Sequence, residues 1–124
     1  SCIEIQADFP VMQGTTLDNL KAAASGENEE WAKLYPQFAD VADEEGFPEI
    51  AEVFRRIADA EKNHETRFLR LAANIANGTV FKKAEKTFWK CTNCGYIHEG
   101  DSAPEKCPAC AHPQGFFEVF KETY

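Results

Sequence analysis

The sequence predicts a mainly α-helical protein, in which an antiparallel helical hairpin forming half of a four-helix bundle precedes a small β/loop metal domain. Three observations support this fold class. Two long segments carry apolar residues at alternating spacings of three and four, Gly46 separates these segments, and two Cys-x-x-Cys motifs lie near the C-terminus.

Composition and charge narrow the possible classes of function. The 124 residues carry a net charge of -8, which disfavours nucleic acids and anionic lipid surfaces as partners. No apolar run reaches about 18 residues, so we expect no membrane span. Residues 1–5 show neither the basic region nor the apolar region of a signal peptide, so we expect none. These features predict a cytoplasmic protein. The chain begins with Ser1 rather than Met, so we expect a true start upstream of Ser1 or removal of an N-terminal segment.

Breakers and caps divide the chain into four parts. Residues 1–15 are expected to form an extended arm or linker, and residues 16–78 the helical hairpin. Thr15-Thr16 supplies an N-cap for the first helix, which is expected to cover about 17–45 and to end at Gly46. The second helix is expected to start at Pro48 and to continue to about Ala76. Residues 79–88 are expected to be a linker and residues 89–124 the metal domain.

Both predicted helices carry an apolar seam of the kind found in packed bundles. The seam of the second helix consists of Ile50, Phe54, Ile57, Glu61, His64, Phe68, Leu71 and Ile75. The seam of the first helix consists of Leu20, Ala23, Glu27, Glu30, Leu34, Phe38 and Val41, with Phe38 one position off strict spacing. Pro36 lies inside the first helix, where the loss of one backbone donor is expected to kink it.

Ionisable residues in an apolar seam require a partner, because an unpaired buried charge is costly. At about 1.5 Å per residue, the seam pairs Glu27/Glu30 and Glu61/His64 both lie near 25 Å from the turn, so they face each other in one layer. Glu61-x-x-His64 places a carboxylate and an imidazole on one helix face, and this donor set suits iron or manganese. The alternative is a buried ion pair between His64 and a glutamate. Glu29 and Glu65 are expected to be solvated.

Four cysteines, Cys91, Cys94, Cys107 and Cys110, form two Cys-x-x-Cys motifs with twelve residues between them. Two such motifs predict a tetrahedral tetrathiolate site, which spacing alone assigns to either iron or zinc. Six nearby aromatic residues are expected to limit solvent access or simply to build a small core: Phe88, Trp89, Tyr96, Phe116, Phe117 and Phe120. The isolated Cys2 is interpreted as an incidental thiol, and His98 and His112 as ordinary surface or loop residues.

These motifs together resemble the rubrerythrin family over nearly the whole chain. Residues 26–36 (GENEEWAKLYP) and 57–65 (IADAEKNHE) resemble the last two helices of its ferritin-like bundle, and residues 44–47 (EEGF) resemble the turn between them. Residues 89–100 (WKCTNCGYIHEG) and 103–113 (APEKCPACAHP) resemble its rubredoxin-like domain.

The resemblance implies a non-haem di-iron peroxidase that reduces hydrogen peroxide to water. It implies that electrons from a reduced-pyridine-nucleotide-linked donor pass through an iron–tetrathiolate centre to the di-iron pair. By position, Glu27, Glu30, Glu61 and His64 correspond to di-iron ligands, and Tyr35 to a tyrosine that hydrogen-bonds a ligand carboxylate. Two alternatives remain: a ferroxidase or iron-handling protein, and a binding module with a zinc ribbon, since zinc can occupy such thiolates.

The sequence departs from this family because it contains one helical hairpin where the family has two. One hairpin supplies half of a di-iron site, so we expect a second hairpin from another polypeptide. Two sources are considered: the family's N-terminal hairpin as a separate or cleaved chain, and a second copy of this chain. The start without Met favours the first source.

Overall fold

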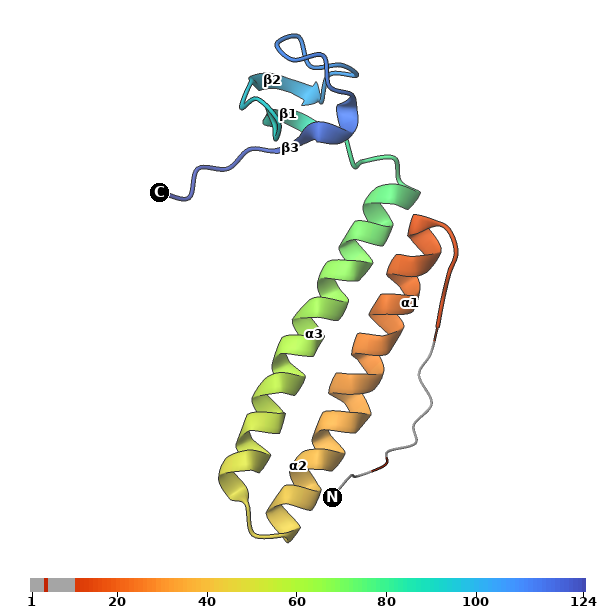
Figure 1. Ribbon diagram of the computed structural model, residues 1–124, viewed down its shortest axis with the longest axis vertical. Coiled ribbons are helices and arrows are strands. Elements are labelled where there is room, and N and C mark those ends of the chain that lie inside the picture. Colours follow the sequence, from red (N-terminus) through yellow and green to blue (C-terminus); the bar gives the residue numbers. More distant parts are fainter. Residues whose placement is uncertain (1–3, 5–10) are drawn as a thin grey trace. The chain divides into compact units, whose positions relative to one another are not determined.

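A computed structural model describes residue 4 and residues 11–124, and it divides the chain into two compact units, Ser1–Ala72 and Ala73–Tyr124. Figure 1 shows the elements of each unit. The predicted arm lies mostly outside the described residues, as does Cys2, while residues 11–15 adopt no helix or strand.

The first long helical segment begins at α1 (Thr16–Glu29) and ends with α2 (Tyr35–Glu44). Thr15 caps α1 as predicted: its hydroxyl oxygen accepts from the Asp18 backbone N–H, and its own backbone N–H donates to the Asp18 carboxylate, each over 3.2 Å. This reciprocal pair is a capping box, which satisfies two backbone donors at the start of the helix.

A π-helical turn, η1 (Glu30–Leu34), joins α1 to α2. In this turn the Tyr35 backbone N–H donates to the Glu30 carbonyl group, so one extra residue is accommodated. Pro36 lies in the first turn of α2, just beyond this π turn, and the kink that the sequence predicts there stays a prediction. The extra residue also explains why Phe38 lies one position off the strict seam spacing.

The turn between the two helical segments follows the prediction closely. Gly46 has a positive φ of 85°, a conformation that residues with a Cβ atom avoid, and α3 (Pro48–Ala76) starts at Pro48. Arg55 of α3 bonds Asp43 of α2 over 2.5 Å beside this turn. Among residue 4 and residues 11–124, no helix is both long enough and apolar enough to cross a bilayer.

Small residues form the contact between the two helical segments. Ala39, Ala42 and Ala51 are buried together, with Phe54 packed against them. The larger seam residues are left open instead: Phe38 is 46% exposed, Ile50 49% and Leu71 41%, whereas Phe54, Ile57 and Phe68 are partly buried. The hairpin thus buries an alanine interface and leaves much of its apolar seam uncovered, as expected for half of a bundle.

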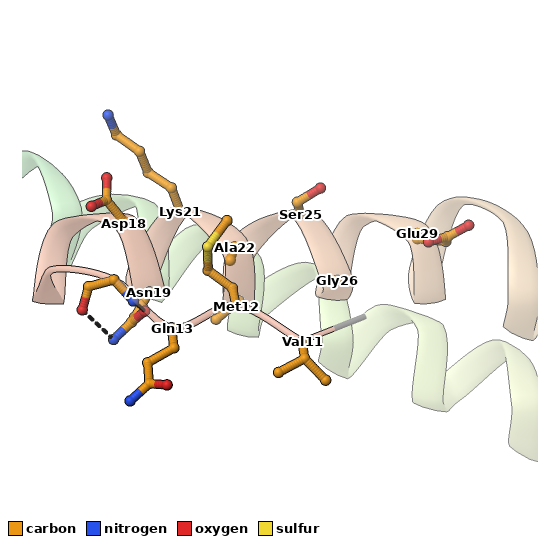
Figure 2. A pocket seen from close by; sticks show the side chains of 12 residues that line it. Val11, Met12, Gln13, Asp18, Asn19, Lys21, Ala22, Ser25, Gly26 and Glu29 are labelled. Atoms are coloured by element: carbon orange, nitrogen blue, oxygen red, sulfur yellow. Dashed lines mark hydrogen bonds between the residues drawn. The ribbon is translucent and has the colours of Figure 1, made fainter. Parts of the chain in front are cut away.

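Residues 11–14 run beside α1 and enclose a groove with it (Figure 2). Its walls include Val11 and Met12 on one side and the small residues Ala22 and Gly26 on the other. The Asn19 side chain bonds both backbone groups of Gly14, which fixes the entry of this segment into the helix.

The second unit contains a three-stranded antiparallel sheet with the order β2-β1-β3. Its strands are β1 (Lys82–Cys91), β2 (Ile97–Ser102) and β3 (Phe117–Val119), with a 3-10 turn, η2 (Gln114–Phe116), before β3. The predicted linker over 79–88 requires correction, because β1 already starts at Lys82 and pairs there with Ser102. The core of this unit consists of Trp89, Cys91, Ala103, Cys107 and Phe117.

Candidate metal centres

A carboxylate–imidazole cluster lies between the two helical segments. Glu27 extends from the last turn of α1, and Glu61 and His64 extend from neighbouring turns of α3. The His64 Nδ1 atom lies 2.5 Å from Glu61 Oε2 and 3.6 Å from Glu27 Oε2. One ligand atom from each residue lies within 4.8 Å of the other two. The hairpin therefore brings together three of the four ionisable residues that the sequence placed in one layer.

Electrostatics within this cluster favour a bound cation. The Glu27 and Glu61 side chains are only 19% and 14% exposed. The Oε2 atom of Glu27 is buried and has no hydrogen-bond partner among the described residues. Burial raises the pKa of Glu27, and the neighbouring Glu61 carboxyl group raises it further. His64 lies within hydrogen-bond distance of Glu61 but 3.6 Å from this Glu27 oxygen, which therefore receives no hydrogen bond, so a metal ion fits the donor set better than an ion pair alone.

Glu30 and Tyr35 flank the cluster without joining it. Glu30 is the first residue of η1, and Tyr35 stacks on Phe54 with ring centroids 6.1 Å apart. Burial raises the pKa of Tyr35, and the negative charge of Glu30 adds to this increase. Within residues 11–124 the Tyr35 hydroxyl group forms no hydrogen bond, so its role toward a ligand carboxylate stays a prediction, as does ligation by Glu30.

Glu65 is a residue whose environment the sequence did not predict. Its carboxylate accepts from Trp31 Nε1 over 2.6 Å and from Asn28 Nδ2 over 3.1 Å. The expectation that Glu65 is solvated is therefore wrong, because it connects α3 with both α1 and η1. A sequence signal did exist: the indole of Trp31 is a donor that requires an acceptor when it is partly buried.

The four predicted cysteines converge in the second unit. The Sγ atoms of Cys91 and Cys110 are 3.7 Å apart, and those of Cys94 and Cys107 are 3.6 Å apart. Four sulfurs bound tetrahedrally at about 2.3 Å would be about 3.8 Å from one another. The sulfur positions thus fit one tetrahedral metal ion.

Two matching turns shape this thiolate site. The Gly95 N–H donates to the Cys91 carbonyl group over 2.8 Å, and the Ala111 N–H donates to the Cys107 carbonyl group over 2.9 Å. Each turn ends in a residue with positive φ, 81° at Gly95 and 62° at Ala111. The second and fourth cysteines therefore occupy equivalent positions in the two turns.

Backbone donors and crowding control the ionisation of these thiols. The His112 backbone N–H lowers the pKa of Cys110 to about 6. The Tyr96 backbone N–H acts in the same direction on Cys94, but burial and three neighbouring thiols raise the pKa of Cys94 to about 12. Four crowded sulfurs cannot all ionise together without a cation, whereas a bound metal stabilises all four thiolates.

The predicted aromatic shell is only partly closed. Trp89 and Phe117 are buried, and Trp89 Nε1 donates to the Gly100 carbonyl group over 3.1 Å. Phe88, Tyr96 and Phe116 remain substantially exposed, and so does Cys94. Much of the aromatic content therefore lies on the surface of this unit, and one face of the thiolate site is open to solvent.

Fold and sites together define a class: helical carboxylate-metal proteins that carry a tetrathiolate domain. The model of the rubrerythrin family matches residues 4–72, and the model described as "Rubrerythrin, rubredoxin-like domain" matches residues 89–118. The chain belongs to the rubrerythrin family.

Relatives from several organisms cover nearly all of this chain. It is 63% identical to a rubrerythrin of Clostridium perfringens over 98% of its length and 63% of the relative's. It is 54% identical to a rubrerythrin of Porphyromonas gingivalis, covering 98% of this chain and 62% of that one. A structure titled "Partially Reduced State of Nigerythrin" aligns with a TM-score of 0.49 and 33% identity, covering 94% of this chain and 55% of that chain. The chain thus spans less than two thirds of the length of the relatives it matches.

The family and the donor sets of both sites indicate iron. Carboxylates with imidazole suit an iron site in a helical bundle, and four thiolates suit a rubredoxin-type iron centre.

Proposed function

We propose that this protein reduces hydrogen peroxide to water at a di-iron site formed by Glu27, Glu30, Glu61 and His64. The observation that carries the proposal is the buried Oε2 atom of Glu27, which accepts no hydrogen bond from the described residues and lies beside Glu61 and His64 in a chain that also holds a tetrathiolate site. The first feature provides a place for a redox metal, and the second provides an entry point for electrons.

The residues of the chain have separate roles in this proposal. When bound, two ferrous ions would supply the two electrons that, together with two protons, convert hydrogen peroxide into two molecules of water. The tetrathiolate iron would return electrons to the pair one at a time. Glu27 and Glu61 hold the ions and balance their charge, while His64 adds a neutral nitrogen donor. Burial and the nearby Glu30 charge raise the pKa of Tyr35, so its hydroxyl group stays protonated and available to donate to a carboxylate.

A second helical hairpin completes the site in this proposal. Di-iron bundles draw a Glu from each of two helices and a Glu-x-x-His from each of the other two, and this chain supplies one of each. Its exposed seam residues, among them Phe38, Ile50 and Leu71, provide the apolar surface for such a partner. We favour the family's N-terminal hairpin as the partner over a second copy of this chain, because the matched relatives are longer than this chain.

Reaction with peroxide and with dioxygen separates this function from iron storage. We expect the fully reduced, iron-loaded protein to be oxidised faster by hydrogen peroxide than by dioxygen, followed anaerobically by stopped-flow absorption. Faster oxidation by dioxygen, with ferric iron accumulating beyond the two sites, would support ferroxidase activity instead. A metal-replete native preparation lacking the visible ferric–thiolate band would support the zinc-binding module. Reduction of the ferric tetrathiolate centre by a reduced-pyridine-nucleotide-linked donor system, followed at the same visible band, tests the source of electrons.

A further inference from the structure

Beside the candidate di-iron cluster, Glu65 joins three parts of the hairpin through side-chain hydrogen bonds. Its two carboxylate oxygens accept separately, Oε2 from Trp31 Nε1 over 2.6 Å and Oε1 from Asn28 Nδ2 over 3.1 Å. Glu65 belongs to α3, Asn28 to α1 and Trp31 to η1. This group of three is called the Glu65 clamp below.

Each residue of the Glu65 clamp directly follows a candidate metal ligand in the sequence. Asn28 follows Glu27 in the sequence, and Glu65 follows His64. Trp31 likewise follows Glu30 within the π turn. A step of one residue rotates a side chain by about 100° around a helix, so the clamp lies at the height of the cluster but on a neighbouring face.

This position allows the clamp to set the register of α3 against α1. The buried contact between the helical segments is made by alanines, whose small, uniform surfaces resist sliding only weakly. A slip of one helical turn, about 5.4 Å, would break both hydrogen bonds of Glu65, since hydrogen bonds tolerate only a few tenths of an ångström. The same slip would separate Glu27 from Glu61 and His64.

A second contact holds the indole ring of the clamp. The Lys62 Nζ atom lies 5.2 Å from the centre of the Trp31 ring, and Lys62 follows the candidate ligand Glu61 in the sequence. Trp31 is thus held at its N–H edge by Glu65 and over its face by Lys62. Because Trp31 belongs to η1, these contacts also stabilise the π turn that positions Glu30.

We infer that Glu65 is a positioning residue for the metal site: through Asn28 and Trp31 it fixes where Glu27 and Glu30 stand relative to Glu61 and His64. The inference rests on the proposed use of this cluster as a metal site, but not on its reaction with peroxide. It predicts that loss of the clamp weakens metal binding while both helices remain folded.

Glu65→Gln tests the inference, because it keeps the size of the side chain but removes its charge and one acceptor. In the full protein, we expect the iron affinity of the carboxylate site to fall by about 10- to 100-fold, as is typical for groups that orient metal ligands. Iron at the tetrathiolate site, measured by its visible absorption, should be unchanged. In the zinc-loaded protein, the Trp31 indole N–H resonance should move upfield, while that of Trp89, which bonds Gly100, should remain in place.

Glu29→Gln is the matched control, because Glu29 is exposed, carries the same charge, and forms no side-chain hydrogen bond within residues 11–124. Trp31→Phe removes only the indole donor and should also lower the affinity, and it decides the question if Glu65→Gln fails to fold. An iron affinity of Glu65→Gln within about twofold of wild type would overturn the inference. If Glu65→Gln is unfolded, the same result for Trp31→Phe would overturn it. An equal loss of iron affinity in Glu29→Gln would also overturn it. Peroxide reactivity of the wild type is measured separately, so failure of the proposed function can be distinguished from failure of this inference about Glu65.

Discussion

Gly95 and Ala111 occupy equivalent places in the two cysteine turns, yet only one of them is glycine. Both have positive φ, 81° and 62°. A residue with a Cβ atom is strained in this conformation by about 1 to 2 kcal/mol. Among the described residues, a Cβ atom at Gly95 would have no atom within 4 Å beyond its two chain neighbours, so a substitution there tests the backbone conformation alone.

Opposite substitutions at these positions should have opposite effects on stability. We expect Gly95→Ala to lower the free energy of unfolding by about 1 kcal/mol and Ala111→Gly to raise it by up to about 1 kcal/mol. Reversible unfolding of the zinc-loaded protein, followed by circular dichroism, provides the measurement. A change of the same sign in both variants would show that something other than backbone strain controls these turns.

Among the helical elements, the π turn η1 affects the candidate site most directly, because it contains Glu30 and Trp31. A π turn accommodates one extra residue in an α-helix, so deleting one residue within it should restore a regular helix and leave both flanks in register. Lys33 is suited to such a deletion because its side chain is exposed and lies inside the turn.

We expect deletion of Lys33 to change the free energy of unfolding by no more than about 1 kcal/mol, while iron binding at the carboxylate site weakens because Glu30 and Trp31 move. Deletion of Asp40, exposed in the regular helix α2, is the control. That deletion rotates the buried Ala39 and Ala42 relative to each other and should cost at least about 3 kcal/mol. Equal destabilisation by the two deletions would contradict the role assigned to the π turn.

Local patterns predicted some elements well and others poorly. Thr15, Gly46 and Pro48 marked helix ends correctly because caps and turns depend on single residues. The off-spacing of Phe38 was visible in the sequence, but the extra residue became clear only from the backbone hydrogen bonds of η1. The first half of β1, rich in lysine, was taken for a linker because its strand pairing depends on distant residues of β2.

The candidate sites show the same contrast between local and distant information. Glu61 and His64 share one helix face by their spacing, and Glu27 was placed opposite them by counting residues from the turn. Glu65 was misjudged because its partners Asn28 and Trp31 lie on the other helical segment, and their rotation depends on η1.

Two features of the hairpin require a second hairpin as a partner. One is its exposed apolar seam, and the other is its ligand set, which supplies only half of a di-iron site. We expect native mass spectrometry of the assembled protein to show two hairpins for each pair of iron ions. The family's N-terminal hairpin, found either as a separate polypeptide or in one chain with these 124 residues, would support that hairpin as partner, whereas a species built only from copies of this sequence would support a homodimer. A monomer that contains only this hairpin and yet binds a full di-iron complement would contradict both.

In the proposed reaction, electrons pass from the tetrathiolate iron through the carboxylate site to hydrogen peroxide. Anaerobic stopped-flow mixing of fully reduced protein with excess peroxide tests this route, with the ferric–thiolate absorption as the signal; excess is needed because the first equivalent can take both of its electrons from the di-iron pair. We expect this band to appear rapidly in the wild type. In Glu61→Ala, metal analysis should show loss of the carboxylate-bound iron with the tetrathiolate iron retained, and the band should appear at least about 100-fold more slowly, since the route through the missing site is closed. The same fast rate in both proteins, or no oxidation of the wild type by peroxide, would contradict this route.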